Sequence, residues 1–156
     1  MPKILFVCLG NICRSPMAEF VMKELVARRG LSSRYTIASA GTYGGTAGDS
    51  VHPGTKQKLA EHGISCKGKV AQKVMRKDYQ EYDWIIGMEE RNLQAMRGIF
   101  SGDAEGKIKK LMDFTAKGGD IEDPWYSGDF ESTWQDVNAG CEGLLDMLEK
   151  PAKRKR

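Results

Sequence analysis

Short apolar runs alternate along this chain with longer stretches in which apolar residues recur at helical spacing. The runs are rich in β-branched and aromatic residues and predict four strands, at residues 3–7, 35–40, 84–88 and within 107–114. Helical spacing predicts helices at residues 16–29, 52–60, 70–82, 89–96 and 129–149. Because strands that alternate with helices form βαβ units, the pattern predicts a single α/β domain in three layers, with a parallel sheet covered by helices on both faces.

The turn between the first strand and the first helix has an unusual composition. Residues 7–16 read V-C-L-G-N-I-C-R-S-P, and Pro16 with Ser15 as a cap predicts that the helix begins there. Unpaired amide N–H groups and the macrodipole make a helix start a binding site for a dianion such as phosphate. The turn is therefore a candidate phosphate-binding loop, although a cysteine after a buried strand is most often a small apolar filler.

Two side chains of this loop add reactivity to anion binding. The field of the helix start favours thiolate over thiol at Cys8, which would make Cys8 a nucleophile at neutral pH. Arg14 carries a planar fork of donors that can hold two phosphate oxygens at once. Gly10 lets the backbone bend without steric cost, and Asn11 is one of the few other residues that tolerate a left-handed conformation.

Composition limits the expected location and partners. The 156 residues are 40% hydrophobic and 29% charged, as in a globular domain, and no apolar run approaches the roughly 20 residues that span a bilayer. No signal peptide is recognised, so we expect a cytoplasmic location and no membrane partner. The formal charge of +3 is too small to indicate nucleic-acid binding. We predict a folded domain over residues 1–150 and a disordered basic tail at residues 151–156.

The cysteines and histidines indicate neither a disulfide framework nor a metal centre. The four cysteines are irregularly spaced and the chain has two histidines, so no metal or cofactor is expected. Cys66 and Cys141 are interpreted as structural. Cys13, five residues after Cys8, could capture an oxidised Cys8 as a disulfide, or it could be a buried filler.

Three segments together resemble one enzyme family. The loop V-C-L-G-N-I-C-R-S-P, the central segment Ser39-Ala40-Gly41-Thr42 and the pair Asp123-Pro124 with the following Trp125 and Tyr126 are similar to the low-molecular-weight protein tyrosine phosphatases. The resemblance covers nearly the whole chain. It implies a twisted four-stranded parallel sheet flanked by helices, and a monomer that hydrolyses phosphotyrosine in proteins without a cofactor.

The resemblance also implies roles for individual residues. Cys8 would form a cysteinyl-phosphate, Arg14 would bind the transferred phosphoryl group, and Asp123 would be the general acid. Asn11, Ser15 and Ser39 would support the loop. The residues expected around the phosphate and the aromatic ring are Leu9, Gly10, Asn11, Ile12, Cys13, Ser15, Trp125 and Tyr126. Many relatives carry a histidine where this chain has Lys69, which leaves the support of the loop open at that point.

Three alternatives to phosphotyrosine hydrolysis stay open. A phosphoarginine phosphatase on the same fold typically has threonine at the position of Ile12, so isoleucine favours phosphotyrosine. An arsenate reductase needs further cysteines that relay a disulfide, and Cys66 and Cys141 do not match that pattern. A module that only binds phosphate would need neither the nucleophile Cys8 nor the acid Asp123.

Overall fold

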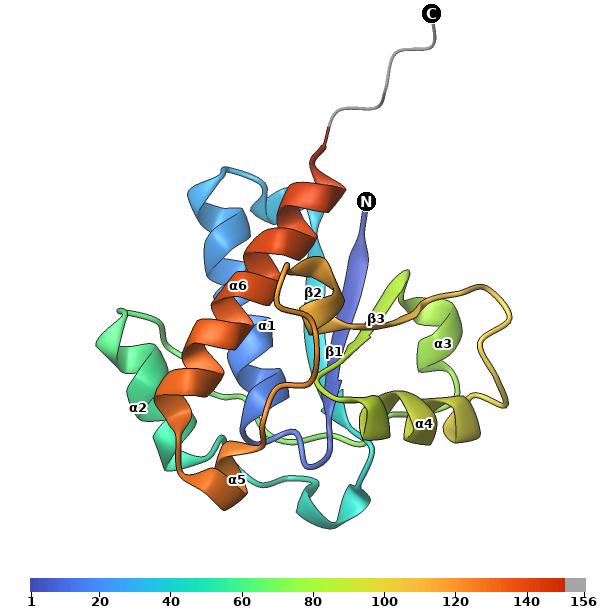
Figure 1. Ribbon diagram of the computed structural model, residues 1–156, viewed down its shortest axis with the longest axis horizontal. Coiled ribbons are helices and arrows are strands. Elements are labelled where there is room, and N and C mark those ends of the chain that lie inside the picture. The colour runs from blue at the N-terminus through green and yellow to red at the C-terminus, as the bar shows by residue number, and fades with distance from the viewer. Residues whose placement is uncertain (151–156) are drawn as a thin grey trace, which may run out of the picture.

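Four parallel strands form the middle layer of the computed structural model, which describes residues 1–150 (Figure 1). The predicted basic tail lies outside these residues. In spatial order the strands are β2 (Thr36–Gly41), β1 (Lys3–Cys8), β3 (Trp84–Gly87) and β4 (Ile108–Lys110). The two central strands pair with Ile4 opposite Trp84 and Val7 opposite Gly87. The predicted four-stranded parallel α/β fold is confirmed.

Helices cover both faces of the sheet, as the apolar pattern predicts (Figure 1). One face is covered by α1 (Arg14–Arg28), α2 (Pro53–Glu61) and α6 (Phe130–Leu148), and the other by α3 (Asp78–Glu81) and α4 (Glu90–Ile99). Alternation along β1 divides its side chains between the two cores: Ile4 and Phe6 point to the first, and Leu5 and Val7 to the second. Short turns complete the chain, namely η1 (Ser32–Arg34), η2 (Gly44–Thr46), η3 (Leu111–Phe114) and α5 (Pro124–Ser127).

The strand order places the end of β1 at the point where the connections diverge. The chain leaves β1 through α1 to β2 on one side, whereas β3 pairs with the other edge of β1. In parallel sheets the crevice at such a switch point is the usual ligand site. Cys8 is the last residue of β1, so the topology puts it in that crevice.

The helix predicted at residues 70–82 is wrong over most of its length, because α3 covers only Asp78–Glu81. Val70 instead forms a bridge with Ser50, and Lys73 forms one with Gly41. The Gln72 carbonyl also accepts a 2.7 Å hydrogen bond from the Gly41 amide. The segment therefore extends the end of β2, where backbone pairing with distant residues outweighs the local helical pattern.

The first helix begins earlier than its proline suggests. It starts at Arg14, Pro16 is its third residue, and the N-cap residue Cys13 makes no side-chain cap hydrogen bond. The prediction that Ser15 caps the helix is wrong, because Ser15 lies inside it. The predicted end is confirmed: the helix stops at Arg28 and Gly30 follows with φ 70°. Among the helices within residues 1–150, none has the length and apolar character needed to cross a bilayer.

Candidate active site

The loop between β1 and α1 curls around the end of the sheet and is held by backbone contacts from distant segments. Asn11 adopts φ 56°, the left-handed conformation expected for it. The Cys8 carbonyl accepts a 3.0 Å hydrogen bond from the Thr42 amide, and the Leu9 carbonyl accepts one of 2.8 Å from the Tyr43 amide. On the other side, the His52 amide donates to the Ile12 carbonyl at 2.8 Å. The loop is therefore fixed at several points along its length.

Behind the loop, a buried hydroxyl contacts the candidate nucleophile. The Cys8 Sγ and Ser15 Oγ atoms are 3.0 Å apart, and Asn11 Nδ2 donates to the same Ser15 oxygen at 2.8 Å. Because the Asn11 amide occupies an acceptor site of this oxygen, the Ser15 hydroxyl can donate to the sulfur at 3.0 Å, with the Ala40 carbonyl oxygen at 3.5 Å as its longer alternative acceptor. This arrangement stabilises a negative charge on Cys8.

Further side chains extend this support to the neighbouring strand and helix. Asn11 Nδ2 donates its second hydrogen to Ser39 Oγ at 2.9 Å, and Ser39 Oγ donates to Glu19 Oε1 at 2.6 Å. Lys69, where the resemblance predicts a histidine, donates to the Ser39 carbonyl at 3.0 Å and lies 3.2 Å from Glu19 Oε1. The lysine thus completes the network through the Glu19 carboxylate, so the support around Asn11 is intact.

Arg14 lies under the loop and is 2% exposed. Its Nη1 atom donates to the Glu89 carboxylate and, at 2.9 Å, to the Ile121 carbonyl, whereas Nη2 donates to Asp123 Oδ2 at 3.3 Å. Burial alone would lower the pKa of the guanidinium, but negative charge on Cys8, Glu89 and Asp123 outweighs it and raises the pKa. The fork is therefore charged and oriented without a ligand.

Asp123 is held in place by both of its carboxylate oxygens. Oδ1 accepts a 3.0 Å hydrogen bond from the Trp125 amide and so caps α5, while Oδ2 accepts from Arg14. Its side chain is 19% exposed, so one edge of the carboxylate faces the solvent of the pocket. The residue lies at a helix start 115 positions after Cys8, and the fold brings it to the same crevice.

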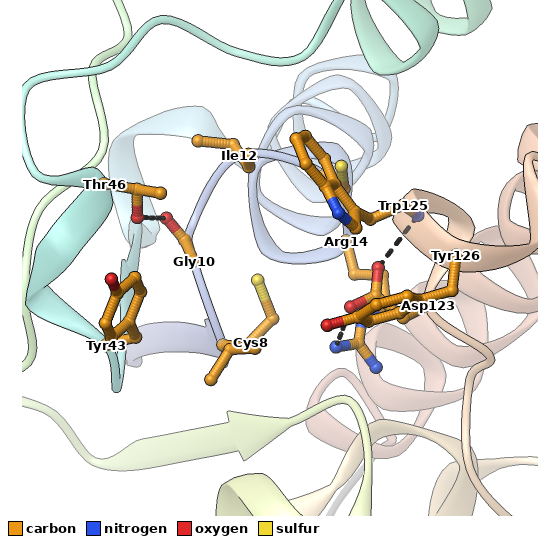
Figure 2. A pocket seen from close by; sticks show the side chains of 11 residues that line it. Cys8, Gly10, Ile12, Arg14, Tyr43, Thr46, Asp123, Trp125 and Tyr126 are labelled. Carbon is orange, nitrogen blue, oxygen red and sulfur yellow. Dashed lines mark hydrogen bonds and ion pairs between the residues drawn. The ribbon is translucent and has the colours of Figure 1, made fainter.

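These residues surround a cavity of about 220 Å³ (Figure 2). Tyr43 and Thr46 line it on one side, and Trp125 and Tyr126 line it on the other, with Cys8 between them. The three aromatic side chains are more than half exposed, so the mouth of the pocket is an apolar rim. Its complete lining is Cys8, Leu9, Gly10, Ile12, Cys13, Arg14, Tyr43, Thr46, Asp123, Trp125 and Tyr126.

Most of the predicted site residues line this pocket, and the other three lie behind the loop. Asn11, Ser15 and Ser39 are 0–1% exposed and support the loop instead of lining the cavity. Glu89, Tyr43 and Thr46 are not predicted from the sequence. Glu89 follows β3 and Tyr43 follows β2, and residues just after parallel strands meet at one edge of the sheet. Their positions just after predicted strands were therefore the signal in the sequence that could have indicated Glu89 and Tyr43.

The two loop cysteines differ in environment. Burial raises the pKa of Cys13 to about 12, so this thiol stays protonated at neutral pH. Both Cys8 and Cys13 are free thiols, and a disulfide between them stays a prediction. Within residues 1–150 no three histidine, cysteine or acidic side chains are grouped in a way that could hold a metal ion.

Comparison with known proteins agrees with this geometry. A family model described as low molecular weight phosphotyrosine protein phosphatase matches residues 3–154. The chain belongs to this family. Low molecular weight protein-tyrosine-phosphatase YfkJ of Bacillus subtilis is 40% identical over 152 residues, which cover 96% of this chain and 97% of YfkJ. PtpA of Staphylococcus haemolyticus is 35% identical and covers 99% of both chains. The predicted family and enzyme class, a protein-tyrosine-phosphatase acting on phosphoproteins, are confirmed.

Solved structures of relatives share the fold over nearly the whole chain. The crystal structure of YfkJ superposes with a TM-score of 0.92 at 39% identity and covers 97% of this phosphatase and 98% of YfkJ. An arginine phosphatase from Drosophila superposes with a TM-score of 0.87 at 28% identity, covering 96% of this chain and 99% of its own. The fold alone therefore does not separate tyrosine from arginine phosphatases.

Proposed function

We propose that this phosphatase hydrolyses aryl phosphates, phosphotyrosine in proteins above all, through a cysteinyl-phosphate on Cys8. The observation that most strongly supports this proposal is that Cys8, Arg14 and Asp123 line one pocket with an aromatic rim. A binding module would need the loop and Arg14 only. The nucleophile and the acid in the same cavity favour catalysis over binding.

In the first step the Cys8 thiolate attacks phosphorus in line with the leaving oxygen. The S–P bond forms as the P–O bond to the phenol breaks, and the Asp123 carboxyl gives its proton to the phenolate oxygen. The equatorial oxygens are held by loop amides and by the Arg14 fork. Ser15 stabilises the thiolate at 3.0 Å, which also makes Cys8 a better leaving group in the second step.

In the second step a water molecule attacks the phosphocysteine. Asp123, now a carboxylate, takes a proton from this water as the new P–O bond forms and the S–P bond breaks. Inorganic phosphate leaves and the thiolate is restored. Both steps use the same three side chains, and no metal or cofactor is invoked.

The rim of the pocket supports an aromatic substrate. Trp125 and Tyr126 on one side and Tyr43 on the other provide apolar surface for a flat phenyl ring above Cys8. Ile12 adds an apolar floor, which suits a ring better than the charged guanidino group of phosphoarginine. We therefore favour phosphotyrosine over phosphoarginine, and we propose that residues 1–150 suffice for this activity in a cytoplasmic monomer.

The test is hydrolysis of p-nitrophenyl phosphate without added metal. Cys8→Ser is expected to abolish turnover, and Asp123→Ala to lower kcat by about 10²- to 10⁴-fold, the usual range for a lost general acid. Cys66→Ser, which changes a buried thiol outside the pocket, is the matched control and should keep most of the activity.

Two comparisons separate the alternatives. Phenyl phosphate has a poorer leaving group than p-nitrophenyl phosphate, so Asp123→Ala should impair its hydrolysis more; equal losses would exclude Asp123 as the acid. Higher kcat/KM for phosphoarginine than for phosphotyrosine would overturn the assigned substrate, and activity that survives Cys8→Ser would overturn the mechanism.

A further inference from the structure

His52 joins the phosphate loop to the aromatic wall without lining the pocket itself. Its amide donates to the Ile12 carbonyl of the loop at 2.8 Å. Its ring meets the Trp125 ring edge-on, with centroids 5.5 Å apart and planes at 77°. This is a favoured geometry for aromatic pairs. One residue therefore contacts both halves of the site.

The imidazole of His52 is itself fixed from two further directions. Nδ1 accepts a 3.0 Å hydrogen bond from the Gly54 amide and so caps α2, and the ring stacks on Phe130 with centroids 5.1 Å apart. Phe130 lies close against Gly54, because a Cβ atom on this glycine would come within 2.4 Å of the Phe130 ring. The imidazole is thus held between α2 and the start of α6.

Trp125, in contrast, has little support from its own helix. It lies on α5, a single turn of four residues, and is 58% exposed. Its backbone amide donates to Asp123 Oδ1, a bond that holds the backbone of Trp125 and does not involve its ring. A side chain in such a short helix depends on contacts with other parts of the fold for its orientation.

We propose that His52 is a positioning residue, whose ring sets the orientation of Trp125 as the wall that receives the aromatic ring of the substrate. This inference rests on the proposed function, since it assigns the wall to an aryl phosphate. The phosphate itself contacts the loop and not the wall. Loss of the His52 ring therefore weakens binding of aryl phosphates and leaves binding of inorganic phosphate unchanged.

Two substitutions separate the contact of the His52 ring with Trp125 from the role of Nδ1 as the N-cap acceptor of α2. His52→Asn keeps an acceptor for the Gly54 amide but removes the ring, and His52→Phe keeps a ring but removes the acceptor. His52→Asn is expected to raise KM for p-nitrophenyl phosphate by about 2- to 10-fold, the range that an aromatic pair contributes, with kcat and the inhibition constant of inorganic phosphate nearly unchanged. His52→Phe should keep KM near that of the wild type.

His62→Asn is the matched control. His62 follows the other end of α2 and stacks on Trp134 with centroids 3.9 Å apart, away from the pocket. Its loss should lower stability and leave KM unchanged. The indole N–H resonances report the contact directly: His52→Asn should shift that of Trp125, assigned with Trp125→Phe, and His62→Asn should shift that of Trp134 instead.

Three results would overturn the role of His52. The first is that KM and the Trp125 resonance are unchanged in His52→Asn. The second is that KM and the inhibition constant of inorganic phosphate rise equally in that variant. The third is that His52→Phe raises KM as much as His52→Asn does. If the wild-type protein did not hydrolyse aryl phosphates, the proposed function would be contradicted instead. The indole N–H resonance of Trp125 in His52→Asn would then still test whether His52 contacts Trp125.

Discussion

Asn11 combines a left-handed backbone with three side-chain hydrogen bonds. Its φ of 56° turns the phosphate loop, its Nδ2 donates to Ser15 and Ser39, and its Oδ1 accepts from the Gln72 amide at 3.0 Å. A glycine would tolerate this backbone and an alanine would not, so the two contributions can be separated.

Asn11→Gly and Asn11→Ala both remove the side-chain bonds, and both should lower kcat/KM for p-nitrophenyl phosphate by about tenfold or more, since one buried hydrogen bond is worth on the order of 1 kcal/mol. Asn11→Ala adds the cost of a left-handed alanine. Its free energy of unfolding, measured in urea, should be lower than that of Asn11→Gly by about 1 kcal/mol. Asn138→Ala, in α6, is a control for loss of an asparagine side chain outside the pocket. Equal stability of the two Asn11 variants would contradict the backbone argument.

At the residue scale, the local pattern predicts the contiguous part of the site, whereas the distant Asp123, Trp125 and Tyr126 are predicted only from the family resemblance. The roles of Cys8 and Arg14 can be predicted because the strand, the loop and the helix start that carry them are contiguous in the chain. Tyr43 lines the pocket, and Glu89 contacts Arg14 beside it, because β2 and β3 both pair with β1. Strand order is a property of the folded sheet, so a local pattern does not contain it.

At the scale of elements, the phosphate loop depends on the close approach of β2. A Cβ atom on Gly41, the last residue of β2, would lie 2.7 Å from the Leu9 carbonyl oxygen and 3.0 Å from the Asn11 amide nitrogen. Both neighbours are backbone atoms of the loop and cannot swing aside. Glycine at this position therefore allows strand and loop to pack together.

Gly41→Ala is expected to displace the loop and to lower kcat/KM by about 10²-fold, because misplacement of reacting groups by about 1 Å has effects of this size. Circular dichroism should still show the α/β fold. Gly98→Ala is the matched control: Gly98 lies in α4 with no atom within 4 Å of an added Cβ. That change should stabilise the helix by about 0.5–1 kcal/mol and leave activity unchanged. Normal activity in Gly41→Ala would show that the loop adapts.

The predicted elements agree with the structure where periodicity is strong. The four strands and the long helices are confirmed, with bounds that shift by a few residues. Residues 70–77 are the main failure: the Ala71 amide donates to the Asp49 carbonyl and the Val74 amide to the Gly41 carbonyl, and both side chains are buried without a helix. The turn α5 was missed because a four-residue helix has no apolar period to detect.

At the scale of the whole molecule, each of the two cores supports part of the site. The core under α1 and α6 reaches from Ile4 to Cys8 and carries the nucleophile at its edge. The core under α4 includes Ile85 of β3, and Glu89, which follows that strand, accepts from Arg14. Because the sheet is shared, the catalytic groups from both faces meet at one end of it. The parallel topology is thus the reason that residues 80 or more positions apart form one pocket.

Buried thiols outside the nucleophile position remain protonated in the native state at neutral pH. Burial raises the pKa of Cys13 from 9.0 to about 12 and raises that of Cys141, which is fully buried and donates to the Ala18 carbonyl. Burial likewise raises the pKa of Tyr35, whose hydroxyl also bonds Glu149. In the unfolded chain these groups ionise at their ordinary values. Above pH 9 the native state therefore binds more protons than the unfolded state.

The free energy of unfolding is accordingly expected to be nearly constant from pH 7 to 8.5 and to fall as pH rises from 9 toward 12, by about 1.4 kcal/mol per pH unit for each fully buried thiol. Urea unfolding at pH 7, 9 and 10.5 measures this slope. Cys141→Ala removes one such group, so the variant should be less stable than the wild type at pH 7 and the difference should narrow by pH 10.5. A difference that stays constant with pH would mean that Cys141 ionises no later in the native chain than in the unfolded one.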